Sequence, residues 1–214
     1  MGAKVQAAWA LACLGVHMSA ASATLVEGNI SGQVQVFTDK GEITSCGLTL
    51  VAIEVPKAPG GVLMVFNGSF TLQDPRGGLV KGRAAQLSGR ALASGKAVPS
   101  DIKPLDTEFV WLKAPGAAAT FPVNSKAIGR SDDPGYQIYV SCLTSLLAIT
   151  EAVTDGRPIQ VGMRVRGRGT DNGLYGKVEL SEPDMAQFQQ CVGEWSSNVL
   201  KMYRDAPGGA GSEP

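Results

Sequence analysis

The clearest candidate for a binding surface is a run of alternating arginines in the sequence MRVRGRG. Arg164, Arg166 and Arg168 are separated by single residues. Successive side chains of a strand point to opposite faces, so the three guanidinium groups are predicted to lie on one face. Such a row is suited to a phosphate, an acidic polysaccharide or an acidic protein. The solvated face of a hairpin is the more common use of this pattern.

Two clusters of acidic residues could supply paired catalytic carboxylates. Asp101, Asp106 and Glu108 form one cluster, and Asp132 and Asp133 form the other. A glycosidase needs two carboxyl groups about 5 to 10 Å apart across a cleft. Both clusters fall in predicted loops or at the start of a strand, where acids commonly bond to the local backbone. Surface acids in turns are the simpler interpretation, and a hydrolase of envelope polymers is the alternative.

Ser100 and Lys103 have the spacing of the serine and lysine in certain acyl-transfer enzymes. That spacing brings the two side chains together only on a helix, and Pro104 disfavours helical backbone at Lys103. The companion motifs S-D-N and K-T-G are absent from the chain. We therefore predict a solvated loop here rather than a catalytic pair.

The chain begins with the pattern of a secretory signal peptide at 1–23. An apolar run at 7–16 follows Lys4, and the sequence ASA at 21–23 is typical of a cleavage site. The apolar run is much shorter than the roughly 20 residues that a membrane-spanning helix requires. We therefore predict cleavage after Ala23, a periplasmic or secreted protein, and no integral membrane span.

Cleavage after Ala23 removes the only histidine, His17, and one of the four cysteines, Cys13. A Ser-His-Asp triad or a histidine-ligated zinc site is then excluded, because both need an imidazole. No complete cofactor or metal motif is found elsewhere, so neither a cofactor nor a metal is predicted. The 19 basic and 19 acidic residues are balanced, which gives no reason to expect nucleic acid as a partner.

Cys46, Cys142 and Cys191 remain after cleavage, and no C-x-x-C motif suggests redox catalysis. An oxidising compartment favours one structural disulfide. Cys142 and Cys191 fall on two predicted helices, so we expect them to pair if both helices lie on the same side of the sheet. Cys46 would then be a buried thiol. A disulfide from Cys46 to either of the others is also open.

The segment from Asn29 to Leu87 has the alternation and turn residues of consecutive antiparallel strands. A surface loop is predicted at 88–104, and later strands at 107–114 and 136–140. Asn172-Gly173 predicts the turn of a further hairpin.

Two helices are predicted at about 142–154 and 182–203. The second has apolar residues at alternating spacings of three and four, which predicts one continuous apolar face. These residues are Met185, Phe188, Val192, Trp195, Val199 and Met202.

The pattern as a whole predicts an α+β fold: a mainly antiparallel, β-sandwich-like sheet with one or two helices packed on it. A single domain is expected at 24–204, followed by a disordered tail at 205–214. The predicted function is an exported, non-enzymatic accessory or binding protein of the bacterial cell envelope. Its expected partner is an envelope protein, for example in a secretion or conjugation assembly. An exported inhibitor or immunity protein is a further alternative, and the oligomeric state is not predicted.

Overall fold

A computed structural model describes the chain at residues 23–57, 60–74, 77–93, 101–123 and 129–205. The predicted signal peptide up to residue 22, Ser100, and the predicted tail beyond Asp205 lie outside these ranges.

The first half of the described chain is an antiparallel meander of long strands. Each strand pairs with its sequence neighbour, and the four are β1 (Thr24–Asp39), β2 (Glu42–Glu54), β3 (Val62–Asp74) and β4 (Gly77–Ser88). Lys40 and Gly41 form the β1–β2 turn with φ of 51° and 86°, and two successive positive φ values are typical of a type I′ hairpin turn. The predicted run of antiparallel strands is therefore confirmed.

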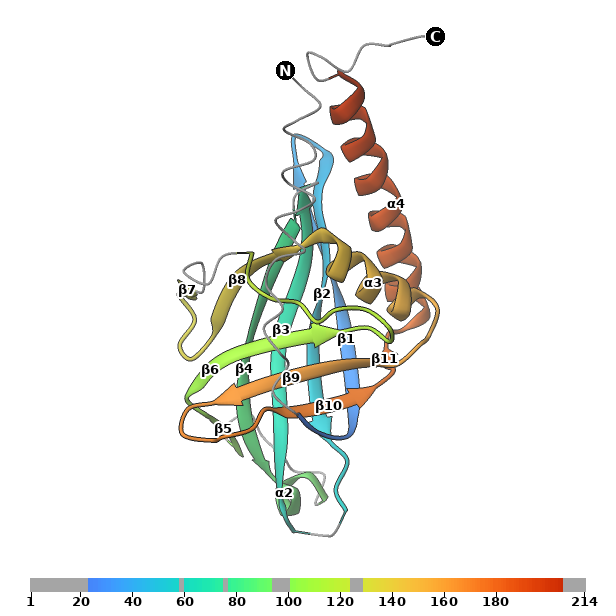
Figure 1. Cartoon of the computed structure of the whole chain (residues 1–214). Helices are drawn as coiled ribbons and strands as arrows, with labels where there is room; N and C mark the ends of the chain where they lie inside the picture. Colours follow the sequence, from blue (N-terminus) through green and yellow to red (C-terminus); the bar gives the residue numbers. More distant parts are fainter. Residues whose placement is uncertain (1–22, 58–59, 75–76, 94–100, 124–128, 206–214) are drawn as a thin grey trace.

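Three shorter strands cross in front of the meander (Figure 1). They are β6 (Thr107–Lys113), β9 (Ile159–Val165) and β10 (Asn172–Gly176), which pair antiparallel in the order β6-β9-β10. β10 pairs in parallel with the beginning of β1, and β11 (Val178–Glu179) pairs in parallel with a later part of β1. The crossing strands and the meander are therefore parts of one hydrogen-bonded sheet.

The α+β fold class is confirmed, but the sheet is a curled half-barrel rather than a sandwich. A sandwich consists of two sheets that face each other and do not share strand pairings. Here the parallel β1–β10 pairing joins the two layers, and the eleven strands of the described residues belong to one sheet. The alternation of side chains within single strands gave no signal for this long-range pairing.

Shorter strands extend the sheet beyond β4. β8 (Gln137–Cys142) pairs with β4, and β7 (Gly129–Arg130) pairs with β8. β5 (Ile102–Pro104) pairs with another part of β4. The segment 88–104 was predicted as a loop, but it contains β5 and the short helix α2 (Gly89–Ala93).

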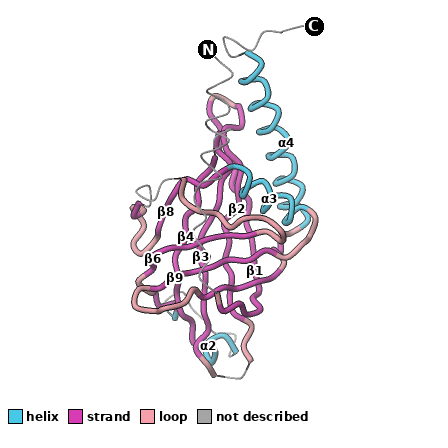
Figure 2. The backbone as a smooth tube through the Cα atoms, in the orientation of Figure 1, coloured by secondary structure: helices cyan, strands magenta, loops and turns pink. Residues whose placement is uncertain are grey.

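The two longer helices, α3 (Leu143–Thr154) and α4 (Glu182–Asp205), agree closely with the predictions. Figure 2 shows both of them against the upper part of the sheet. α4 packs along β1 and β2 and buries Phe188 and Trp195, so its predicted apolar face is confirmed there. Its first turn is capped by Ser181, whose Oγ accepts a hydrogen bond from the Asp184 backbone N at 3.2 Å.

The core lies between the meander on one side and the crossing strands and helices α3 and α4 on the other. Its largest fully buried side chains include those of Leu48, Leu50, Phe66, Phe70, Leu112, Ile149 and Phe188. Gly162 of β9 lies directly against the Trp111 indole of β6, where any side chain at position 162 would overlap the ring. A glycine is therefore required at this close approach between neighbouring strands.

The hairpin predicted around Asn172-Gly173 is present, but its turn lies elsewhere. β9 ends at Val165 and β10 begins at Asn172. Asn172 is therefore part of a strand, where it pairs with Met163 of β9. The connection at 166–171 includes Gly167, whose φ is 77°. The local turn propensity of Asn172-Gly173 is overridden because these residues complete pairings with both β9 and β1.

A disulfide joins Cys46 of β2 to Cys191 of α4, with 5.9 Å between the Cα atoms. The predicted pairing of Cys142 with Cys191 is therefore wrong, and so is the prediction that Cys46 is a buried thiol. The physical reason is the position of α4, which lies along β1 and β2. Cys142 ends β8, on the far side of the meander beyond β3 and β4.

Candidate functional site

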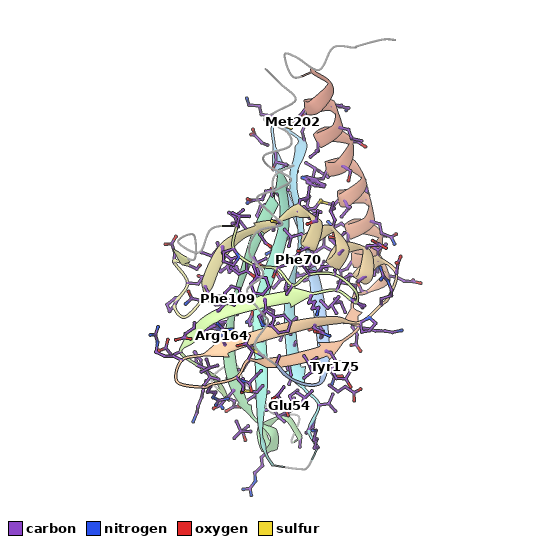
Figure 3. All side chains as sticks on the ribbon, in the orientation of Figure 1. Glu54, Phe70, Phe109, Arg164, Tyr175 and Met202 are labelled. Atoms are coloured by element: carbon purple, nitrogen blue, oxygen red, sulfur yellow. A yellow bond between two sulfur atoms is a disulfide. The ribbon has the colours of Figure 1, made fainter. Side chains whose placement is uncertain are left out.

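Arg164 forms a partly buried ion pair with Asp171 instead of lying free on an open surface. Its Nε and Nη2 donate to the Asp171 carboxylate at 2.7 and 3.2 Å, and Trp111 Nε1 donates to the same carboxylate at 3.1 Å. Asp171 is only 2% exposed. The hydrogen bond to Asp171 raises the pKa of Arg164 above its ordinary value. Arg164 is labelled in Figure 3, where it lies on the crossing strands.

Arg166 and Arg168 lie beyond the end of β9, so the three arginines do not form a row on one strand. The positive φ of Gly167 breaks the extended backbone between them. Arg166 Nε donates to Asp106 Oδ2 at 2.8 Å, and both side chains are largely exposed. Arg168 Nη1 lies 3.7 Å from the sulfur of Met64. A partner-binding role for these residues stays a prediction. The row on one strand face that motivated it is not present.

A polar cleft of about 480 Å³ lies between residues 105–108 and the loop that precedes β8. Asp106, Glu108 and Arg166 all line it. The structure therefore brings two of the predicted carboxylates to a common cleft. Asp101, Asp132 and Asp133 do not line this cleft.

A β-bulge directs Glu108 toward the cleft. Thr107 pairs with Val165 and Phe109 pairs with Arg164, so Glu108 is an extra residue between them. Thr107 and Phe109 are buried on either side of it, whereas Glu108 is exposed. Bulges of this kind reorient a side chain and are frequent beside functional sites.

The wall that carries Asp106 is fixed to the sheet by hydrogen bonds. Thr107 Oγ1 accepts from the Ala84 backbone N at 2.8 Å and donates to the Leu105 carbonyl at 3.1 Å. The Arg166 backbone N donates to the Asp106 carbonyl at 2.8 Å. The carboxylate of Asp106 is therefore attached to a rigid part of the fold.

The opposite wall is a tight loop that ends in Tyr136. The Ser131 backbone N donates to the Tyr136 carbonyl at 3.1 Å, and Lys81 forms an ion pair with Asp133. The Tyr136 ring also contacts two cations of β4: Lys81 Nζ lies 5.0 Å and Arg83 Cζ 4.6 Å from its centroid. Such contacts are attractive because the ring face is electron-rich. The ring is therefore held at the edge of the cleft.

Sequence reasoning missed Tyr136, Lys81 and Arg83 as members of this site. The sequence KGR at 81–83 contained a signal, because two cations two residues apart in a strand share one face. Their contact with Tyr136 depends on the pairing of β4 with β8, which brings together residues more than fifty positions apart.

The predicted exclusion of a serine–lysine pair is untested at Ser100. Lys103 lies in β5 and pairs with Gln86 of β4, so its backbone is extended. Among the residues that the structure describes, no group of three or more His, Cys, Asp and Glu side chains could hold a metal ion. None of the helices in the described ranges is long and apolar enough to cross a membrane.

A second candidate surface is the projecting upper end of the molecule (Figure 1). We call residues 35–45 of the β1–β2 hairpin and residues 192–202 of α4 the arm. The two segments are joined by a hydrogen bond from Asn198 Nδ2 to the Ile43 carbonyl at 3.2 Å. Phe37, Leu200 and Met202 are exposed on the arm by 48%, 64% and 64%.

Comparisons of the chain with protein-family models, curated proteins and solved structures found no match. Function is therefore inferred from the geometry of the arm and the cleft.

Proposed function

We propose that this chain is an exported, non-enzymatic accessory or binding protein of the bacterial cell envelope, and that it docks to a protein partner through the arm. The observation that carries the proposal is the exposure of Phe37, Leu200 and Met202 at one end of the molecule. Large apolar side chains that are exposed rather than buried are a feature of many protein interaction sites. Met202 is labelled at this end in Figure 3.

The arm also carries polar and charged residues. Asp39 and Lys40 form the hairpin tip, and Glu194 and Lys201 lie on the facing part of α4. Protein interfaces usually combine apolar and polar side chains. The Cys46–Cys191 disulfide lies at the base of the arm and supports a fixed orientation of helix and hairpin. The signal-peptide pattern supports export.

The test uses the mature chain with a photo-reactive residue in place of Leu200, exposed to its native envelope fraction. We expect one envelope protein to be crosslinked, and we expect that purified protein to bind the mature chain in calorimetry. Leu200→Asp combined with Met202→Asp should abolish both results. Val62→Asp is the matched control, because Val62 is 65% exposed but lies at the start of β3, at the opposite end. Equal loss with Val62→Asp would contradict docking through the arm.

The same assay tests two alternatives. Arg166→Glu combined with Arg168→Glu should leave binding unchanged, and loss of binding would move the docking surface to these arginines. If the captured partner is an enzyme that the mature chain inactivates, the protein is an inhibitor or immunity protein that uses the same arm.

A hydrolase of envelope polymers is the second candidate, favoured by the common cleft of Asp106 and Glu108. A general acid needs an environment that keeps its carboxyl protonated near neutral pH, commonly burial in an apolar pocket. Both of these side chains are exposed, and Asp106 is paired with Arg166. We therefore expect no release of new reducing ends from peptidoglycan. Release that disappears in Glu108→Gln would establish the hydrolase instead.

A further inference from the structure

We propose that the cleft between residues 105–108 and Tyr136 binds a neutral carbohydrate chain. The cleft and the arm are different surfaces, so this binding site goes beyond the proposed docking function. Its volume of about 480 Å³ is within the range of about 300 to 1,000 Å³ that small-ligand sites occupy.

The charges around the cleft do not favour a charged ligand. The carboxylates are those of Asp106 and Glu108 in the lining and of Asp133 in the adjacent loop. The cations are Arg166 in the lining, and Lys81 and Arg83 against the Tyr136 ring. Asp106 is paired with Arg166, and Asp133 is paired with Lys81, so these charges largely neutralise each other. The surroundings of the cleft therefore have no large excess of either charge to attract an ion, and a neutral ligand needs none.

The hydrogen-bonding groups of the lining suit hydroxyl groups. The Asp106 and Glu108 carboxylates accept hydrogen bonds, the Arg166 guanidinium donates them, and the Ser131 hydroxyl does both. A sugar hydroxyl is both a donor and an acceptor. One hydroxyl group can therefore donate to a lining carboxylate while its neighbour accepts from the guanidinium. A peptide would need apolar subsites for its side chains, whereas this lining is mainly polar.

Tyr136 provides the apolar part of the site. An aromatic ring packs against the C–H faces of a sugar ring, and its contribution is largest when the ring is already fixed. Lys81 and Arg83 hold this ring from β4. Arg83 Nε has no hydrogen-bond partner in the described part of the chain. Because this atom is buried, a ligand in the cleft does not reach it. The bulge at Glu108 sets the opposite wall.

The test is a calorimetric titration of the mature chain with three tetrasaccharides that differ in charge. The probes are chitotetraose, which is neutral, its fully deacetylated form, which is cationic, and tetragalacturonate, which is anionic. We expect chitotetraose to bind with a Kd below about 1 mM and each charged probe to bind at least about tenfold more weakly. Absence of chitotetraose binding, or a preference for either charged probe, would overturn the proposal.

Variants locate the binding. Tyr136→Ala should weaken chitotetraose binding about tenfold, whereas Tyr136→Phe should stay within about twofold because the ring remains. Tyr175→Ala is the control, since Tyr175 is an exposed tyrosine on β10 and does not line the cleft. If Tyr136→Ala does not fold, Glu108→Gln carries the test and should also weaken binding. Unchanged binding in the folded cleft variants would overturn the proposal.

The result of the carbohydrate titration does not depend on the proposed docking function. The Leu200→Asp variant should bind chitotetraose as the original chain does, even where it loses its protein partner. Failure of the carbohydrate titration therefore leaves the arm proposal intact, and failure of the partner assay leaves the cleft intact.

Discussion

Asp171 explains why one arginine of the predicted row has a structural role. Its carboxylate is buried and accepts hydrogen bonds from Trp111 and Arg164. A buried carboxylate needs a counter-charge, because removal from water disfavours its ionised form. Arg166 forms a similar pair with Asp106 in solvent, where water competes for both partners. Two arginines that look alike in the sequence therefore differ in their energetic role.

We predict that Arg164→Met lowers the free energy of unfolding by about 2 to 3 kcal/mol, because it leaves the buried Asp171 carboxylate without a counter-charge, although Trp111 still donates to it. Arg166→Met should lower it by less than about 1 kcal/mol. Urea unfolding of the two variants measures this difference. Equal losses would contradict the assignment of a structural role to Arg164 alone.

Tyr139 is a second buried polar residue, at the contact between β8 and β6. Its hydroxyl lies 2.8 Å from Thr120 Oγ1 and donates to the Val110 carbonyl at 2.9 Å. Burial raises the pKa of Tyr139 above its ordinary value of 10.0, because the phenolate would be poorly solvated. The hydrogen bond with Thr120 lowers that pKa by a smaller amount.

The raised pKa of Tyr139 predicts a loss of stability in alkali. Below an ordinary pKa of 10.0 the hydroxyl is protonated in both the folded and the unfolded chain. Above it the unfolded chain releases the proton first, so the free energy of unfolding falls by up to about 1.4 kcal/mol per pH unit until the folded pKa is passed. Tyr139→Phe should cost about 1 to 2 kcal/mol near neutral pH.

Unfolding curves of both proteins at increasing pH test this prediction. The advantage of the original chain over Tyr139→Phe should shrink above pH 10, because the variant lacks the titrating hydroxyl. An advantage that is constant or grows with pH would show that Tyr139 is not held in its neutral form.

At the scale of elements, the disulfide and the α4 contacts decide how the helix lies on the sheet. Phe188 packs edge-on against Phe70 of β3, and Trp195 Nε1 donates to the Gln73 carbonyl at 3.1 Å. The Cys46–Cys191 bond lies between these two contacts along α4 and closes a loop of 145 residues. A long closed loop restricts the unfolded chain strongly, by about 5 kcal/mol in the chain-entropy account.

We predict that replacing Cys46 and Cys191 by alanine lowers the free energy of unfolding by about 3 to 5 kcal/mol. Val199 and the rest of α4 beyond Trp195 should then be cleaved faster in limited proteolysis, because fewer contacts hold this part of the helix. Chemical denaturation and a timed digestion measure the two effects. A loss below about 1 kcal/mol would show that the apolar contacts of α4 are sufficient by themselves.

At the scale of the whole molecule, the half-barrel has a well-packed middle and a thinly packed arm. The central strands β2 and β3 are paired on both sides, and the crossing strands lie over them, with β9 in contact with β3 and β10 in contact with β2. The side chains of the hairpin tip around Lys40 are exposed. Backbone amides are most protected where a strand has partners on both sides and its side chains are buried.

Hydrogen exchange should reflect this distribution. We expect the slowest amides in β3 and β9, and exchange at 38–43 faster by several orders of magnitude. Binding of the protein partner should slow exchange in the arm, and binding of chitotetraose should slow it near Tyr136. A uniformly protected hairpin tip would contradict the open arm.

Local pattern was sufficient for the elements that depend on nearby residues. The strands from Asn29 to Leu87, the turn at Lys40-Gly41 and the start of α4 at Ser181 all follow from side-chain period, turn chemistry or capping. The α+β class follows from the same patterns. These features need interactions over only a few residues, so the sequence alone determined them.

Only the tertiary structure decided the contacts between distant residues. The partner of Cys191 lies 145 positions away, and β1 pairs with β10 across most of the chain. Asn172-Gly173 has the local signal of a turn, yet pairing on both sides places it in a strand. The position of Tyr136 beside its two cations likewise depends on the pairing of β4 with β8. Packing and strand pairing outweigh local preference at these positions, since they involve many more contacts than a single turn.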